Sequence, residues 1–202
     1  MNIHYADREM EGERLELADK EHLTYLGPNL TLRRCHVLIR VPASGLVVLP
    51  TRFIDCTLEV KQELKNFAWT CAALKGCQVK GRLTGCDFGP WRDYTKGWEH
   101  GAIEDCDFSE ARLDGCRFHG CDPRTVRFPP WPCFTILDPI GRSQELKSVP
   151  WPGRFDVILD MLATEPPSTV ALTYHAPSLA KRRGMTTEEL RAAIERFDFI
   201  VR

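Results

Sequence analysis

Small and large apolar residues recur every five positions between residues 101 and 121. The small residues are Gly101, Cys106, Ala111, Cys116 and Cys121, and the large ones, two positions after the first four, are Ile103, Phe108, Leu113 and Phe118. A helix face repeats every 3.6 residues and a strand face every 2. A period of five therefore requires a chain that turns a corner in each unit. The pattern predicts a solenoid whose coils stack as parallel strands about 4.8 Å apart.

Cysteines carry the same pattern through a longer part of the chain. A cysteine followed two positions later by an aliphatic or aromatic residue occurs at positions 35, 56, 77, 86, 106 and 116. The steps between the first three are equal, and the step from Cys86 to Cys106 is shorter by a single position. Four sides of five residues make a coil of twenty. We therefore expect two stacked columns, with Cys86 and Cys106 in the second column, about half a coil from the first.

The segment CDFSEARLDGCRFHG resembles the pentapeptide-repeat family, whose motif is Ala or Cys, Asp or Asn, Leu or Phe, a small polar residue and a free position. The resemblance implies a right-handed quadrilateral β-helix. It also implies inward side chains at Cys106, Ala111, Cys116, Phe108, Leu113 and Phe118, and outward ones at Asp107, Arg112 and Arg117. The motif is clearest over residues 101–121, weaker over 53–88 and faint over 30–40.

The resulting fold class is mainly β, a β-helix with a small C-terminal α-helical appendage. We expect an N-terminal cap (1–29), a β-helix of four to five coils (30–128), a Pro-rich strap (129–152) and the appendage (153–202). The predicted helices lie in RFDVILDMLATE, within STVALTYHA, in SLAKRRG and in TTEELRAAIERF. Ser178 is the expected N-cap and Gly184 the expected stop of the third, and Thr186 and Glu189 form a capping box in the last.

Composition indicates a cytoplasmic protein of bacterial type. The chain has 202 residues, 43% of them hydrophobic, which suffices for a core. The opening segment MNIHYADREMEGERLELADKEH contains no apolar run, so no signal peptide is expected, and no later stretch has the length of a membrane span. The nine cysteines follow the repeat phase, so we expect reduced, buried thiols that pack as small apolar residues.

Charge separates the activities that the family brings to mind. Several pentapeptide-repeat proteins protect type II topoisomerases by imitating DNA, which requires a strongly acidic surface. Residues 31–128 carry 15 Lys or Arg and 12 Asp or Glu, a net charge of +3, while residues 1–30 carry seven acids and three bases. The repeat region therefore does not resemble DNA. The acidic excess is confined to the expected cap.

Nucleic acid is a disfavoured partner. In the segment 178–197, Ala180, Gly184 and Leu190 have the spacing of a helix-turn-helix unit. Arg183 occupies a position that is usually apolar in such units, and Glu188 and Glu189 would face the phosphates. Two packed helices joined by a glycine turn satisfy the same spacing without DNA.

The sequence predicts neither an enzyme nor a cofactor or metal site. It contains no Gly-rich phosphate loop, no G-x-S-x-G and no H-E-x-x-H motif. His175 lies in an apolar stretch, which favours a packed histidine over a catalytic base. Cys116, His119 and Cys121 are close in sequence, but the repeat phase sends His119 outward and the two thiols inward, so zinc is disfavoured.

The segment GPWRDYTKGWEHG, residues 89–101, is the candidate protein-binding site. The five-residue phase would place Asp93 inside the coil, so we expect this side to bulge out as a loop. The binding candidates are Trp91, Arg92, Tyr94, Trp98, Glu99 and His100, with the two tryptophans as anchors. In the competing interpretation, the tryptophans fold back over the solenoid or the appendage.

Two functions remain open. The first is a protective protein of the immunity type, which binds and neutralises a cognate toxin or effector. The alternative is a topoisomerase-protecting or nucleic-acid-associated pentapeptide-repeat protein. The sequence does not identify the partner or the oligomeric state.

Overall fold

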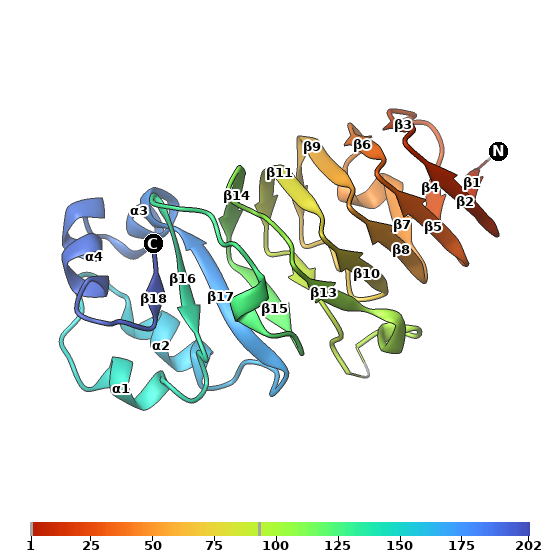
Figure 1. Ribbon diagram of the computed structural model, residues 1–202. Helices are drawn as coiled ribbons and strands as arrows, with labels where there is room; N and C mark the ends of the chain where they lie inside the picture. Colours follow the sequence, from red (N-terminus) through yellow and green to blue (C-terminus); the bar gives the residue numbers. More distant parts are fainter. Residues whose placement is uncertain (1, 93) are drawn as a thin grey trace.

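The chain from Ile3 to Phe128 winds as a four-sided parallel β-solenoid (Figure 1). The structure is a computed structural model, and it describes residues 2–92 and 94–202. The first wall contains β1 (Ile3–Tyr5), β4 (Thr24–Leu26) and β7 (Leu46–Val48), and in later coils β12 (Asp87–Phe88) and β15 (Cys116–His119). The second wall contains β2 (Arg8–Glu11), β5 (Leu30–Arg33), β8 (Thr51–Ile54), β10 (Ala72–Lys75) and β13 (Ala102–Glu104).

The third and fourth walls belong to one sheet, in which the two long strands turn a corner. They contain β3 (Arg14–Leu17), β6 (His36–Ile39), β9 (Thr57–Lys65), β11 (Gln78–Thr84) and β14 (Ala111–Asp114). The pairing of β9 with β11 shifts register after Gly81, and there the chain passes from the third wall to the fourth. The first two coils have irregular chain on the fourth wall, including the 3-10 helix η1 (Ala43–Gly45). The solenoid is therefore most regular in its later coils.

Left-handed backbone makes the corner between the second and third walls. The residue at this corner has a positive φ in successive coils: Arg34 (51°), Asp55 (52°), Gly76 (63°) and Asp105 (52°). Glycine adopts this conformation freely, and aspartate tolerates it better than most residues. The amide at each corner donates to the next coil, as from Asp55 to the Lys75 carbonyl at 2.8 Å. Each corner thus fixes the register of two coils.

The cysteines stack in two columns, but not with the membership that the spacing predicted. Cys35, Cys56, Cys77 and Cys106 form the first column, and their thiols donate to the carbonyls of Met10, Leu32, Phe53 and Leu74 in the preceding coil. Cys86 and Cys116 belong to the second column and donate to Leu64 and Leu83. Placing Cys106 with Cys86 was wrong, because an insertion between them lengthens the coil. The thiols fill the interior and also satisfy corner carbonyls.

The inward positions are confirmed. Cys106, Ala111, Cys116, Phe108, Leu113 and Phe118 are all at most 7% exposed. Aromatic rings stack along the axis, with Phe88 and Phe118 nearly parallel at 5.3 Å between centroids. Of the residues expected to face outward, Arg112 is exposed, whereas Asp107 and Arg117 are half-buried.

Residues 1–29 do not form a separate cap. From Ile3 onward the chain makes the first coil through β1, β2 and β3, and β4 opens the second. Leu15 and Leu17 are buried in the solenoid core, so the β-helix begins well before residue 30. The sequence pattern did not predict this coil, because acidic residues occupy its outward positions.

The C-terminal region is mixed α/β rather than helical. It contains β16 (Cys133–Leu137), α1 (Ser143–Lys147), α2 (Asp156–Leu162), β17 (Thr169–His175), α3 (Ala176–Arg183), α4 (Thr187–Ile194) and β18 (Ile200–Val201). The predicted helix within residues 168–176 was wrong, because this stretch is strand β17, which pairs antiparallel with β15 and β16. The expected strap likewise contains β16 and α1.

Other details of the helices follow the sequence. The capping box of Thr186 and Glu189 is present, and Gly184 ends α3 with a φ of 70°. Ser178 is not an N-cap, because α3 begins two residues earlier, and its hydroxyl contacts His175. The helices gather at one end of the solenoid (Figure 1). In the part of the chain that the structure describes, no helix is long and apolar enough to cross a membrane.

Two glycines test the packing of coil on coil. A Cβ at Gly81 would lie 2.1 Å from the Val60 carbonyl oxygen, with φ at 102°, whereas a Cβ at Gly115 meets open space and only φ (66°) is unfavourable. We expect Gly115→Ala to cost about 1 kcal/mol and Gly81→Ala about 3 kcal/mol or more in free energy of unfolding. Urea unfolding of the two variants measures the difference. Equal losses would contradict the close stacking at Gly81.

Thiol reactivity tests burial. All nine cysteines are free, eight are buried and Cys121 is half-buried. Burial raises the pKa of Cys116 and raises that of Cys121 to about 11, which lowers the thiolate fraction at neutral pH. We expect a thiol reagent to label Cys121 first and slowly, and the Cys121→Ser variant to remain unlabelled while folded. Rapid labelling of that variant without denaturant would contradict the buried columns.

Candidate protein-binding site

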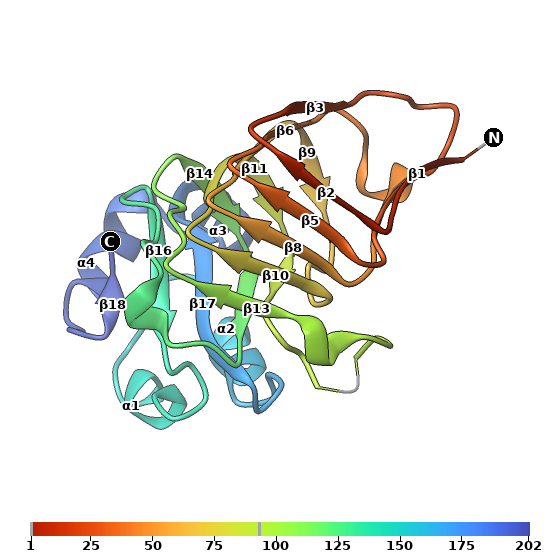
Figure 2. The ribbon, with the colours of Figure 1, turned by 45° about the vertical axis from the view of Figure 1, so that its right-hand side comes forward.

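Residues 89–101 leave the solenoid as a projecting loop between β12 and β13 (Figure 2). Ala73 pairs with Arg52 in the coil before it and with Ala102 in the coil after it. The step to Ala102 is the longer of the two along the chain, although the strand register is the same on both sides. The additional residues are therefore accommodated outside the wall. Asp93, whose unfavourable inward phase was the reason for expecting a bulge, lies outside the described part of the chain.

The returning half of the loop is fixed to the preceding coil. Thr95 Oγ1 lies 3.2 Å from Thr70 Oγ1 and 3.3 Å from Cys71 Sγ, and Cys71 Sγ donates to the Lys96 carbonyl at 3.4 Å. Gly97 is buried with a φ of 92°, and a Cβ there would lie 3.3 Å from the Pro50 ring. A 3-10 helix, η2 (Trp98–His100), then leads into β13. These contacts attach the returning half of the loop to the preceding coil.

Trp91 fixes the outgoing half. Its ring stacks on Tyr94, with centroids 3.9 Å apart and planes 5° apart, and on His119 at 4.8 Å. The Arg117 guanidinium lies 4.9 Å from the Trp91 ring centroid. Trp91 is half-buried, so the interpretation in which this tryptophan folds back over the solenoid describes its position. The contacts make it a support of the loop.

Tyr94 is the exposed aromatic side chain of the loop, at 49% exposure. Arg92, Glu99 and His100 are also exposed, and Trp98 is half-buried. His100 Nε2 lies 3.9 Å from Glu99 Oε1. The structure thus brings together two pairs of the predicted residues, Trp91 with Tyr94 and Glu99 with His100. The exposed Tyr94 ring is supported by the Trp91 ring stacked against it.

A buried charge cluster beneath Trp91 joins the loop to the C-terminal region. Asp87, 4% exposed, accepts from Arg117 Nε at 2.6 Å and Nη2 at 3.0 Å, and lies 3.1 Å from His119 Nε2. Arg117 also reaches Glu165 at 3.4 Å. On its other side, His119 Nδ1 lies 3.3 Å from the hydroxyl of Thr169 at the start of β17. The sequence did not predict this cluster, although Asp87 and Arg117 both directly follow a column cysteine.

Asp114 makes a second connection to the C-terminal region. It is 5% exposed and accepts from Arg182 of α3 at 2.6 and 3.0 Å. This hydrogen-bonded carboxylate raises the pKa of Arg182. Removing Arg182 would leave the buried Asp114 carboxylate without its cation, so this contact helps to hold α3 against the last coil.

The possible zinc ligands serve other purposes. Cys116 donates to the Leu83 carbonyl, and both ring nitrogens of His119 have hydrogen-bonding neighbours. His119 does point away from the coil axis, but it is fully buried, because Trp91 and β17 cover it. Among the described residues, no three His, Cys, Asp or Glu side chains are grouped so that they could hold a metal ion.

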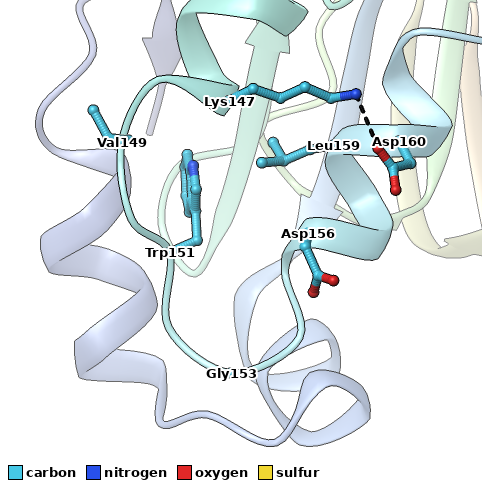
Figure 3. Close-up of a pocket in the computed structure, with 7 residues that line it drawn as sticks. All are labelled: Lys147, Val149, Trp151, Gly153, Asp156, Leu159 and Asp160. Atoms are coloured by element: carbon cyan, nitrogen blue, oxygen red, sulfur yellow. Dashed lines mark hydrogen bonds and ion pairs between the residues drawn. The ribbon is translucent and has the colours of Figure 1, made fainter.

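A hollow of about 390 Å³ lies in the C-terminal region (Figure 3). Lys147 Nζ donates to Asp160 at 2.9 Å across it, and Trp151 forms one wall. The Trp151 ring is stacked on Phe155 at 4.0 Å, and its indole N–H donates to the Leu146 carbonyl. The polar groups of this hollow are therefore largely used in packing its own helices together.

One solved structure shows a weak similarity to this chain. No protein-family model matches the sequence, and no curated protein matches it. The chain is similar to the solved structure of full-length QnrB1, a plasmid-mediated fluoroquinolone resistance protein, with 13% identity over 62% of this chain and 81% of that one. The TM-score is 0.21, and no residue role transfers at that similarity. The β-solenoid itself agrees with the resemblance to pentapeptide-repeat proteins.

Stability measurements distinguish the supporting role of Trp91 from the exposed position of Tyr94. We expect Trp91→Ala to lower the free energy of unfolding by about 1–2 kcal/mol, because it removes a stacked ring over Arg117 and His119. Tyr94→Ala removes a half-exposed ring and should change stability by less than about 0.5 kcal/mol. Thermal and urea unfolding of the two variants provide the comparison. A larger loss for Tyr94→Ala would reverse the assignment.

Proposed function

We propose that this chain is a non-enzymatic protein that acts by binding one protein partner through the 89–101 loop. The observation that carries the proposal is the preorganised tip, in which Tyr94 is exposed and stacked on a Trp91 ring that is itself fixed to the solenoid. Tyrosine is enriched among residues that dominate binding energy. A side chain that is already ordered loses little conformational entropy on docking.

The polar residues around the tip suit a protein surface. Arg92, Lys96, Glu99 and His100 are exposed and carry both signs of charge. Such a rim contributes specificity and association rate more than affinity. Trp98, half-buried in η2, lies between the rim and the wall and contributes part of its surface to the same contact.

Two partner classes follow from this proposal. An immunity-type protein would hold a cognate toxin or effector on the loop in the cytoplasm. Protection of a topoisomerase is the second candidate, favoured by the β-solenoid fold of the family that the sequence resembles. The charges on the walls argue against the DNA-imitating form of that activity, because several carboxylates there are paired with cations, as Glu9 is with Arg33 and Glu104 with Lys75.

The proposal is tested by capturing a protein partner from a lysate of the source organism and then measuring its affinity for variants of this chain. We expect a protein captured by the parent chain to lose affinity about tenfold or more with Tyr94→Ala, since truncating a binding anchor costs about 2 kcal/mol. The matched control is Tyr25→Ala, a half-buried tyrosine of the first wall far along the chain from the loop. If Tyr94→Ala kept its full affinity for the partner while Tyr25→Ala lost affinity, the interface would lie elsewhere than on the loop.

A supercoiling assay separates the two partner classes. We expect gyrase activity, with or without a quinolone, to be unaffected by the parent chain, because the repeat region carries a net charge of +3 rather than an acidic surface. Protection at micromolar protein that Tyr94→Ala abolishes would favour the topoisomerase over the toxin. Protection that Tyr94→Ala leaves intact would contradict the loop as the interface.

A further inference from the structure

Four cations stack at one corner of the solenoid. Ile39, Val60, Gly81 and Ala111 are in register from coil to coil, and each is followed by a cation: Arg40, Lys61, Arg82 and Arg112. The pairing of Arg82 with Arg112 is direct. All four side chains are exposed. We call these four residues the cation column. It lies between the third and fourth walls, diagonally opposite the corner that carries the 89–101 loop.

Stacked like charges are unfavourable in a sheet, and the other walls avoid them. Lys80 is paired with Glu110 at 2.9 Å, for example, and Lys75 with Glu104 at 3.1 Å. In the cation column, Arg40 contacts Glu16 and Lys61 contacts Glu59. Arg82 has no ion pair among the described residues, and Arg112 contacts the Ser178 hydroxyl at 3.0 Å. The cations of the column that have no carboxylate partner among the described residues therefore lie in the later coils.

Two hollows beside the column widen the basic surface. One, of about 610 Å³, is lined by residues that include Lys61, Lys65 and Arg82, and the other, of about 270 Å³, by residues that include Lys20, Arg40 and Lys61. Glu63 is the only carboxylate that lines either hollow among the described residues, and it accepts from Thr84. The hydrogen bond from Thr84, together with the nearby charges of Lys65, Arg82 and Arg112, lowers the pKa of Glu63. The column and hollows together hold six cations and face the carboxylates of Glu16, Glu59 and Glu63.

We infer that the cation column is a second binding surface, which takes an acidic, extended segment of a protein partner. Four rungs at about 4.8 Å span about 14 Å, the length of about four extended residues, so two carboxylates on one side of such a segment can face the column. The hollows are lined by Pro42, Ala43 and Ser44 beside the cations, and no Phe, Trp or Tyr among the described residues lines them. A single-stranded nucleic acid would need aromatic platforms for its bases. The surface therefore favours an acidic peptide.

Binding of a Glu-rich peptide tests this inference independently of the loop. The probe is a peptide of about twelve residues, its affinity measured at about 50 mM salt, where screening is weak. We expect Arg82→Gln/Arg112→Gln to weaken binding about tenfold, with the Tm unchanged or raised because like charges are removed. The matched control is Arg52→Gln/Arg127→Gln, which removes the same charge from exposed arginines on other parts of the solenoid. This control should change affinity less than twofold.

Each other result would overturn the inference. Equal losses in the two double variants would mean attraction to net charge alone, and no detectable binding to the parent chain would mean that the column takes no acidic segment. Tighter binding of an oligothymidylate than of the peptide would assign the surface to nucleic acid. Tyr94→Ala should bind the peptide as the parent does, so failure of the loop proposal and failure of this one are distinguishable.

Discussion

Each coil of this protein must return to the same register above the previous one, because the backbone groups of one coil are satisfied by the next. The hydrogen bonds at the corners show the constraint directly, as from the Gly76 amide to the Glu104 carbonyl at 3.0 Å. Every buried backbone donor needs such a partner. Residues that cannot meet the register are displaced outward. The additional residues of the 89–101 loop therefore lie outside the coil, and among those described Tyr94 is exposed there.

The same constraint aligns side chains of one type in columns. A residue type repeated at one position of the coil becomes a line of side chains about 4.8 Å apart along the axis. Thiols in such lines fill the interior, and the line of cations at the corner after Ile39 forms the cation column. The loop and the cation column lie at diagonally opposite corners of the solenoid, so the two proposed binding surfaces are separate.

Much of the solenoid could be predicted from the sequence. The period of five identified the inward positions of Phe108, Leu113 and Phe118, because these side chains point toward the solenoid axis and are buried there. The column of Cys106 could not be read from spacing alone, because an insertion resets the count without changing the register. Strand β17 was mistaken for a helix because it is buried on both faces, so its sequence lacks the alternation of a half-buried strand, although its Thr, Val and Tyr residues favour a strand. The Asp87 cluster depends on contacts between distant segments, so no local pattern in the sequence signals it.

Deleting residues 91–100 tests the register constraint most directly. Joining Pro90 to Gly101 leaves three residues between Phe88 and Ala102, the same number that separates Trp69 from Ala73, the partner of Ala102 in the preceding coil. Amide hydrogen exchange of the deletion variant reports on β13, β14 and β15 individually. The constraint predicts that their amides remain as protected as in the parent chain, apart from a uniform small loss that reflects the missing Trp91 contacts. Loss of protection confined to these three strands would contradict it, since the loop would then be part of what holds the last coil in place.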